Sequence, residues 1–281
     1  MASSGAALGF GLLSASAWGG ADFAGGVGAR RSSALLVTTA GQAVSLLILL
    51  TICLVFHLAT PGWAYLLYAA VGGFEGALAL AAFYRALAMG AMGLTAALTG
   101  LLTALVPVVF ELFHESLPSP LTALGLAAGC VAIWLITHSP AGKDAATPSR
   151  ALLLGGCAGA GFGAQLILFK MASPGGVLWA LTSARIAGVA ALIIVIAIAH
   201  PARPWQGFWL IGILSGVLDT LGNLFYILTA QYGRLDVAAV ICSLYPAGTI
   251  LLAALVLRER PTGRQWAGMA LALATVGLLS L

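Results

Sequence analysis

Residues 71–76 read Val-Gly-Gly-Phe-Glu-Gly, and residues 215–220, which lie 144 positions further along the chain, read Ser-Gly-Val-Leu-Asp-Thr. Each run lies inside a long apolar stretch and carries an acid at the same position, Glu75 in the first and Asp219 in the second. An acid at the equivalent position of two apolar stretches indicates an internal repeat. An internal repeat constrains the fold of the whole chain more strongly than any local motif.

Two other pairs of segments keep nearly the same spacing. Phe-Tyr at 83–84 matches Phe-Tyr at 225–226, and His-Glu-Ser at 114–116 matches Arg-Glu-Arg at 258–260. The spacing drifts by only a residue or two between these anchors. This small drift indicates that an ancestral unit of about half the chain was duplicated and later gained short insertions.

The composition identifies the solvent around the chain. Of the 281 residues, 61% are hydrophobic and 7% are charged, and the mean hydropathy is +1.07. Soluble domains contain about 25% charged residues, so we predict an integral membrane protein. The net charge of +4 comes mostly from Lys and Arg in short connections, where they meet lipid headgroups. Nucleic acid is therefore not an expected partner.

The apolar stretches predict an all-α membrane protein. Lipid offers no hydrogen-bond partner to the backbone, so a single segment crosses a membrane as a helix whose N–H and C=O groups bond to each other. Crossing a hydrocarbon core of about 30 Å takes roughly 20 helical residues. The expected domains are a first five-helix repeat at 1–137, a polar linker at 138–150 and a second five-helix repeat at 151–281. The ten predicted helices lie at 8–28, 33–56, 63–87, 93–113, 121–137, 151–171, 176–199, 205–230, 235–256 and 264–281.

The two repeats are expected to be inverted in the membrane. Each holds five helices, an odd number, so the second repeat enters from the opposite side. An inverted pair gives a transporter two near-equivalent arrangements, with the substrate site near the midplane where the halves meet. A monomer is sufficient for this design, and a dimer stays open.

Small and cyclic residues mark where the helices approach or break. Gly72 and Gly76 form a GxxxG step, as do Gly212 and Gly216, and both steps favour close helix packing. A proline interrupts each of two predicted helices, the one at 93–113 and the one at 235–256.

Several segments resemble one transporter family. They are Trp-Gly-Gly-Ala-Asp-Phe at 18–23, Phe-Tyr-Arg-Ala-Leu at 83–87, Ser-Leu-Tyr-Pro at 243–246, and the acids Glu115 and Glu259. Together they make the chain resemble the EamA-type members of the drug/metabolite transporter superfamily. The resemblance implies a secondary transporter, often an exporter of amino acids, other metabolites or toxic compounds. The Ala- and Gly-rich composition, with no organellar targeting signal, fits a multi-pass protein of a bacterial cytoplasmic (inner) membrane.

Candidate site residues are polar groups within the predicted helices. Asp22, Glu75 and Asp219 lie near helix centres, where a carboxylate must face protein or a wet cavity because lipid exposure costs several kcal/mol. Gln165 is the counterpart of Asp22 in the second repeat. We therefore expect the pairs Asp22/Gln165 and Glu75/Asp219 to line one central chamber.

The predicted helix at 205–230 carries a polar face. Asp219, Asn223 and Tyr226 follow i, i+4, i+7 spacing, which places them on one side of the helix. Trp18 lies one turn before Asp22 and is a candidate for stacking on a substrate.

Three further charged residues have competing interpretations. Arg185 could hold a substrate carboxylate through its planar guanidinium, although an ion pair with one of the acids is favoured. Arg85 and Glu111 lie late in their helices and are expected to extend their charges to the membrane interface. The acids themselves could bind a cationic or zwitterionic substrate, exchange a proton for it, or only pair with Arg185 and cap backbone groups.

We predict a secondary active transporter, an exporter or antiporter of a small polar metabolite, that works by alternating access at a midplane acidic site. The alternative is a proton-coupled multidrug cation exporter, which would use the same acids in a wide aromatic cavity. An intramembrane enzyme is a remote third option. Such an enzyme would need a nucleophile with a base, or a metal cluster, and the histidines lie at predicted helix ends, away from the acids: His57, His114, His138 and His200. No cofactor, metal or nucleotide-binding loop is expected.

The orientation of the chain gives two conflicting predictions. Connections after even-numbered helices carry only Lys170 and Arg234. The positive-inside rule then places both termini outside, whereas the family resemblance implies cytoplasmic termini. Both predictions place the termini on one side. Connections after odd-numbered helices carry Arg30, Arg31, Lys143, Arg150, Arg203, Arg258, Arg260 and Arg264.

Overall fold

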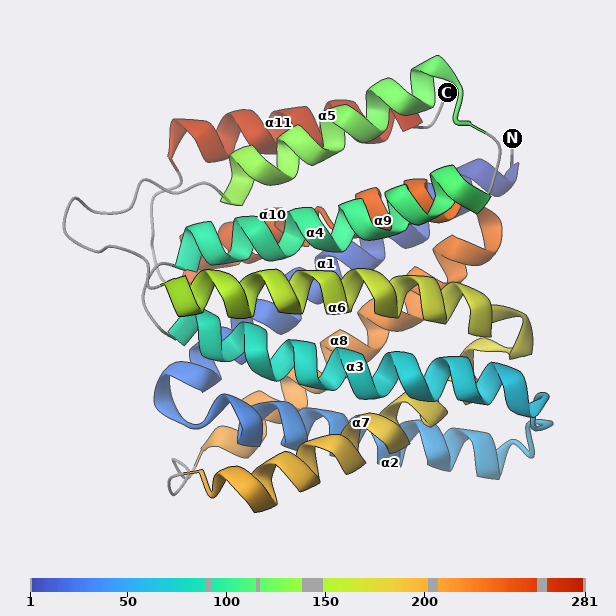
Figure 1. The fold of residues 1–281 in the computed structure, drawn as a ribbon, viewed down its shortest axis with the longest axis vertical. Helices are drawn as coiled ribbons and strands as arrows, with labels where there is room; N and C mark the ends of the chain where they lie inside the picture. Colours follow the sequence, from blue (N-terminus) through green and yellow to red (C-terminus); the bar gives the residue numbers. More distant parts are fainter. Residues whose placement is uncertain are drawn as a thin grey trace.

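The computed structural model describes residues 2–88, 92–114, 117–137, 149–201, 207–256 and 262–279. Regular structure in these ranges is entirely helical, and the helices lie side by side as an elongated bundle (Figure 1). The elements are α1 (Ala2–Arg31), α2 (Ala34–Val55), α3 (Trp63–Ala88), α4 (Met92–His114), α5 (Pro120–Thr137), α6 (Ser149–Ala172), the short 3-10 turn η1 (Ser173–Gly175), α7 (Val177–Ala199), α8 (Phe208–Tyr232), α9 (Leu235–Cys242), α10 (Tyr245–Val256) and α11 (Gly263–Leu279).

The prediction of a multi-pass membrane protein is confirmed at the level of length and hydropathy. Large apolar side chains cover the outside of the bundle, as expected for a surface in contact with lipid tails. Within the described residues, six helical stretches are long and apolar enough to cross a membrane: Ala34–Val55, Trp63–Ala86, Ser149–Gly175, Val177–Ala199, Trp209–Tyr232 and Leu235–Val256.

One predicted helix requires a correction. The stretch 235–256 is two helices, α9 and α10, separated by residues 243–244. Pro246 has no N–H to donate to the carbonyl one turn earlier, which weakens a continuous helix at this point. By contrast, α4 continues through Pro107. The predicted start of the eighth helix, Glu115 and Glu259 lie outside the described residues.

The helices of the two halves pack against each other rather than within each half. Helix α3 lies between α6 and α7, and α8 lies between α1 and α2. Helix α4 packs on α6, and the broken pair α9 and α10 packs on α1. Helices α5 and α11 pack on each other and form an outer pair at one edge of the bundle (Figure 1).

Glycines permit the closest of these contacts. A Cβ added at Gly41 in α2 would lie 2.5 Å from the carbonyl oxygen of Gly212 and 2.8 Å from the Cα of Gly216, both in α8. A Cβ added at Gly73 in α3 would overlap the backbone of Ala184 in α7. Backbone therefore touches backbone at both places, and this fixes how each helix is rotated about its axis.

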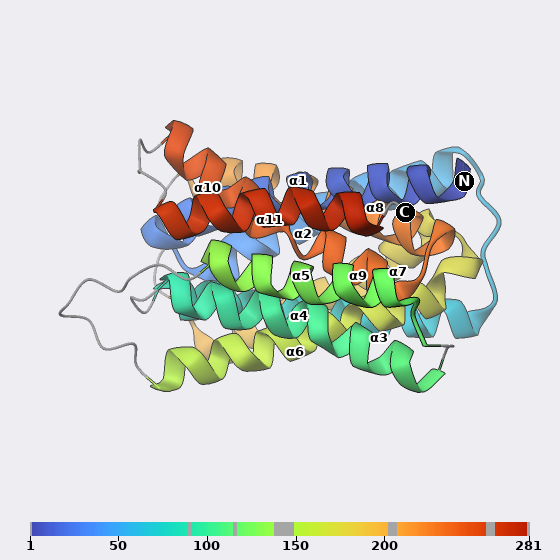
Figure 2. The ribbon, with the colours of Figure 1, turned by 90° about the horizontal axis from the view of Figure 1, so that it is seen from above.

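The described parts of α1 and α11 begin and end, respectively, at the same end of the bundle (Figures 1 and 2). We call this the terminal end. Helices α4, α6 and α8 also finish there, and α9 begins there (Figure 1). The prediction that both termini lie on one side agrees with this arrangement.

Candidate functional site

A cavity of about 50 Å³ lies where the two halves meet. Its wall draws on helices α1, α2, α3, α4, α6, α7, α8 and α10. Six of the eight residues singled out from the sequence line it: Trp18, Asp22, Gln165, Arg185, Asp219 and Asn223. We call this space the central cavity.

Asp219 is neutralised by a close ion pair. The Nη2 of Arg185 in α7 lies 2.6 Å from the Oδ2 of Asp219 in α8, and the two side chains are only 6% and 19% exposed. Arg185 also donates to the Oγ1 of Thr220 at 3.3 Å. The Nδ2 of Asn223 donates to Asp219 Oδ1 at 3.2 Å. The ion-pair interpretation of Arg185 matches this geometry, and the pair connects α7 to α8.

Asp22 stands in a different environment. Within the described residues its carboxylate has no hydrogen bond and no ion pair, although it interacts electrostatically with Asp219. Trp18 precedes it by one turn of α1 and stacks on Tyr226, with ring centroids 6.0 Å apart. Trp18 also meets Tyr245 edge to face at 6.2 Å. An uncompensated carboxylate therefore lies beside an aromatic wall.

Gln165 connects the cavity wall to α3. Its Nε2 donates to the carbonyl oxygen of Gly72 at 3.0 Å, and its amide fills the space above Gly76. The side chain of Gln165 therefore packs directly on the two glycines of the GxxxG step in α3.

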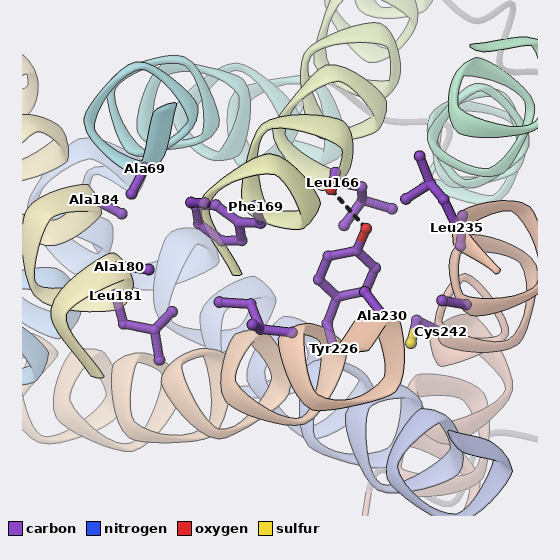
Figure 3. Packing of buried hydrophobic residues seen from close by; sticks show 14 of the residues in the cluster. Ala69, Leu166, Phe169, Ala180, Leu181, Ala184, Tyr226, Ala230, Leu235 and Cys242 are labelled. Atoms are coloured by element: carbon purple, nitrogen blue, oxygen red, sulfur yellow. Dashed lines mark hydrogen bonds between the residues drawn. The ribbon is translucent and has the colours of Figure 1, made fainter. Parts of the chain in front are cut away.

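Two predicted residues lie outside the cavity wall. Tyr226 is completely buried, and its hydroxyl donates to the carbonyl oxygen of Leu166 at 2.6 Å (Figure 3). Glu75 is partly buried and faces α6, where its Oε1 lies 3.7 Å from a Cβ built on Gly161. Successive helical residues are about 100° apart, so Gly76 lines the cavity and Glu75 does not. The structure thus does not bring Glu75 and Asp219 into one chamber.

The sequence reasoning missed Gln42 in α2. It is 4% exposed, it lines the cavity, and its Oε1 has no hydrogen-bond partner among the residues that the structure describes. Gly188 in α7 leaves room for it, because a Cβ there would lie 2.5 Å from that oxygen. The Nε of Arg185 is a second buried atom without a partner. The acids were identified as polar side chains within apolar helices. Gln42 is also a polar side chain within an apolar helix, so the same criterion could have found it.

Thr103 of α4 also lines the cavity and was not among the predicted site residues. Its hydroxyl donates to the carbonyl oxygen of Thr99 at 2.8 Å, and Thr99 donates to that of Gly155 in α6 at 2.8 Å. These hydroxyls chiefly join α4 to α6. No group of three or more His, Cys, Asp or Glu side chains suited to a metal ion occurs in the described part of the chain.

Glu111 requires a correction. It was expected to reach the membrane interface, but it is 6% exposed and its Oε1 accepts a hydrogen bond at 3.2 Å from the backbone N–H of Leu235, the first residue of α9. The carboxylate is buried because the start of α9 packs over the last turn of α4.

Comparisons with known proteins agree with the fold and the membrane environment. A solved structure described only as "Crystal structure of protein" superposes with a TM-score of 0.77 over 97% of this chain and 95% of that chain, at 15% sequence identity. At that identity the likeness concerns the fold alone. No curated protein sequence matches this chain significantly. The sequence profile of the EamA-like transporter family matches residues 149–281. The part of the chain that this profile matches carries Gln165, Arg185, Asp219 and Asn223.

Proposed function

We propose that the protein is a secondary active transporter that carries a small cationic or zwitterionic metabolite, such as an amino acid, through the central cavity. The observation that carries the proposal is the contrast between two carboxylates in one cavity. Asp219 is paired with Arg185 at 2.6 Å, whereas Asp22 has no partner among the described residues. An unpaired carboxylate away from water is costly, and a bound cation or proton removes that cost.

Alternating access between inverted repeats is the mechanism that we propose. The packing pattern supports it, because exchanging the halves leaves the main contacts around α1, α3, α6 and α8 unchanged. Helix α3 packs on α6 and α7 as α8 packs on α1 and α2, and α4 packs on α6 as α9 and α10 pack on α1. This supports repeats at 1–137 and 151–281, joined by 138–150, with α9 and α10 counted as one broken span among ten.

The size of the cavity supports a closed arrangement. About 50 Å³ holds one or a few waters, so a metabolite enters only when the helices around it separate. When no cation is bound, the carboxylate of Asp22 is best solvated with the cavity open to water. A cation bound to Asp22 replaces that water and therefore stabilises the closed form. Substrate and proton would then compete for Asp22, which couples their movements in opposite directions. Export across a bacterial cytoplasmic membrane is the direction that the family resemblance favours.

A multidrug cation exporter is the second candidate. The aromatic side chains of Trp18, Phe162 and Tyr245 in the cavity wall favour it, because such rings attract organic cations. Its distinguishing property would be tolerance of many unrelated lipophilic cations, where a metabolite transporter accepts a narrow set.

The test uses proteoliposomes containing the full chain, at two pH values. Thermal stabilisation and counterflow are measured with amino acids, polyamines and lipophilic cations. Asp22→Asn should abolish binding of the accepted compound and any proton coupling. Glu75→Gln is the matched control, since it makes the same change outside the cavity, and it should keep most of the activity. Counterflow that survives Asp22→Asn unchanged would refute the assignment.

A further inference from the structure

A second hollow opens at the terminal end of the bundle. It has a volume of about 310 Å³ and lies between the last turns of α4 and α6 and the corner that joins α8 to α9. Its wall includes the charged residues Glu111, Lys170 and Arg234. We call it the terminal hollow.

Two of these charges hold the α8–α9 corner from both sides. The Nζ of Lys170 in α6 donates to the carbonyl oxygens of Ala230 and Gly233, at the end of α8. Glu111 in α4 accepts from the N–H of Leu235, where α9 begins. A cation at a helix C-terminus and an anion at an N-terminus each complement the helix dipole. The corner is therefore fixed to α4 and α6 by charge-assisted hydrogen bonds, which are stronger than neutral ones.

Neighbouring contacts close the same region. Gln231 Nε2 in α8 donates to the carbonyl oxygen of Ser173 at 2.9 Å, just beyond α6. Tyr226 donates to Leu166 at 2.6 Å one level deeper (Figure 3). Leu166 lines the central cavity, and the next residue, Ile167, lines the terminal hollow. Two adjacent residues of α6 thus line the two different spaces.

The positions that align with Lys170 and Glu111 in the other half of the chain carry no charge. At the spacing of 144 that relates Glu75 to Asp219, Lys170 corresponds to Gly26 and Glu111 corresponds to Leu255. Neither of these residues can form a charge-assisted hydrogen bond. Two repeats with identical contacts would open to either side with equal ease, so the difference at these aligned positions favours one state.

We propose that Glu111 and Lys170 form a clamp that holds the central cavity closed toward the terminal end, and that opening to this side requires its release. The inference rests on the proposed alternating access. It names a conformational role for two residues that do not line the central cavity. Loss of either side chain shifts the resting population toward the state open at the terminal end.

The experiment measures access rather than transport. Thr103→Cys is introduced into the full chain after Cys53, Cys130, Cys157 and Cys242 are replaced by alanine. A membrane-impermeant thiol reagent is then applied from either side of vesicles whose orientation is established with an N-terminal tag. Lys170→Met and Glu111→Met should each raise the labelling rate from the terminal side by about tenfold, as expected for losing a hydrogen bond to a charged group.

Controls separate release of the clamp from general loosening. Lys170→Arg keeps the charge and should stay near the parent rate. Arg150→Met removes an exposed cation at the start of α6, at the opposite end, and should change nothing. An unchanged rate in both clamp variants, or an equal rise from both sides, would overturn the proposal. Because the assay needs no substrate, its result is independent of whether Asp22→Asn abolishes transport.

Discussion

The Arg185–Asp219 ion pair gives the sharpest quantitative prediction. Replacing Arg185 by Met leaves Asp219 without its cation at 2.6 Å, next to the equally uncompensated Asp22. Removing one partner of a buried ion pair typically costs about 3–5 kcal/mol of unfolding free energy. We expect a loss within that range, since the two side chains are only 6% and 19% exposed.

The reverse change should be milder. In Asp219→Asn, Arg185 loses its partner, but Asp22 lines the same cavity and interacts electrostatically with position 219. The amide oxygen of the new asparagine can still accept from the guanidinium, so the expected loss is about 1–3 kcal/mol. The double variant Arg185→Met/Asp219→Asn removes both charges and should be more stable than Arg185→Met alone.

The assay is reversible unfolding of the purified protein in mixed micelles, followed as a double-mutant cycle. Clear non-additivity is expected for residues in direct contact. The reasoning fails if Arg185→Met costs less than about 1 kcal/mol, if Asp219→Asn proves the more damaging change, or if the two effects simply add. Ser183→Ala, two residues before Arg185 and bonded to α3 through Leu66, serves as a control for unrelated loosening of α7.

Two other predictions concern packing. Gly41→Ala should destabilise the protein by about 1–3 kcal/mol, because the new methyl would lie 2.5 Å from the oxygen of Gly212. Gly26→Ala is the matched control, with nothing within 4 Å of the added Cβ, and equal thermal stability of the two variants would contradict the packing argument. Tyr226→Phe should cost about 1 kcal/mol through the lost bond to Leu166. Its substrate selectivity in counterflow should match the parent, and an altered selectivity would instead indicate that the hydroxyl reaches the substrate.

The helix positions were predictable from local sequence, because lipid forces each spanning segment to satisfy its backbone within one helix. The predicted ranges agree with the helices to within a few residues at most ends, apart from the break before Pro246 and the start of α1. Helix α1 begins at Ala2, well before the predicted residue 8. The small residues ahead of the apolar stretch are helical too, but they are not strongly hydrophobic, so hydropathy alone did not include them.

The amino-acid sequence alone indicates that this chain is a helical membrane protein, that its halves carry matching polar positions, and that Asp22, Arg185 and Asp219 lie within apolar stretches. These are consequences of composition and spacing along the chain. The folded structure was needed to show that Asp219 pairs with Arg185 while Asp22 has no partner among the described residues, that Gly76 lines the cavity in place of Glu75, and that Glu111 is buried beneath the start of α9. The reason is that each residue turns a helix by about 100°, and the rotation of a helix is fixed by glycine contacts with neighbours far away in the sequence.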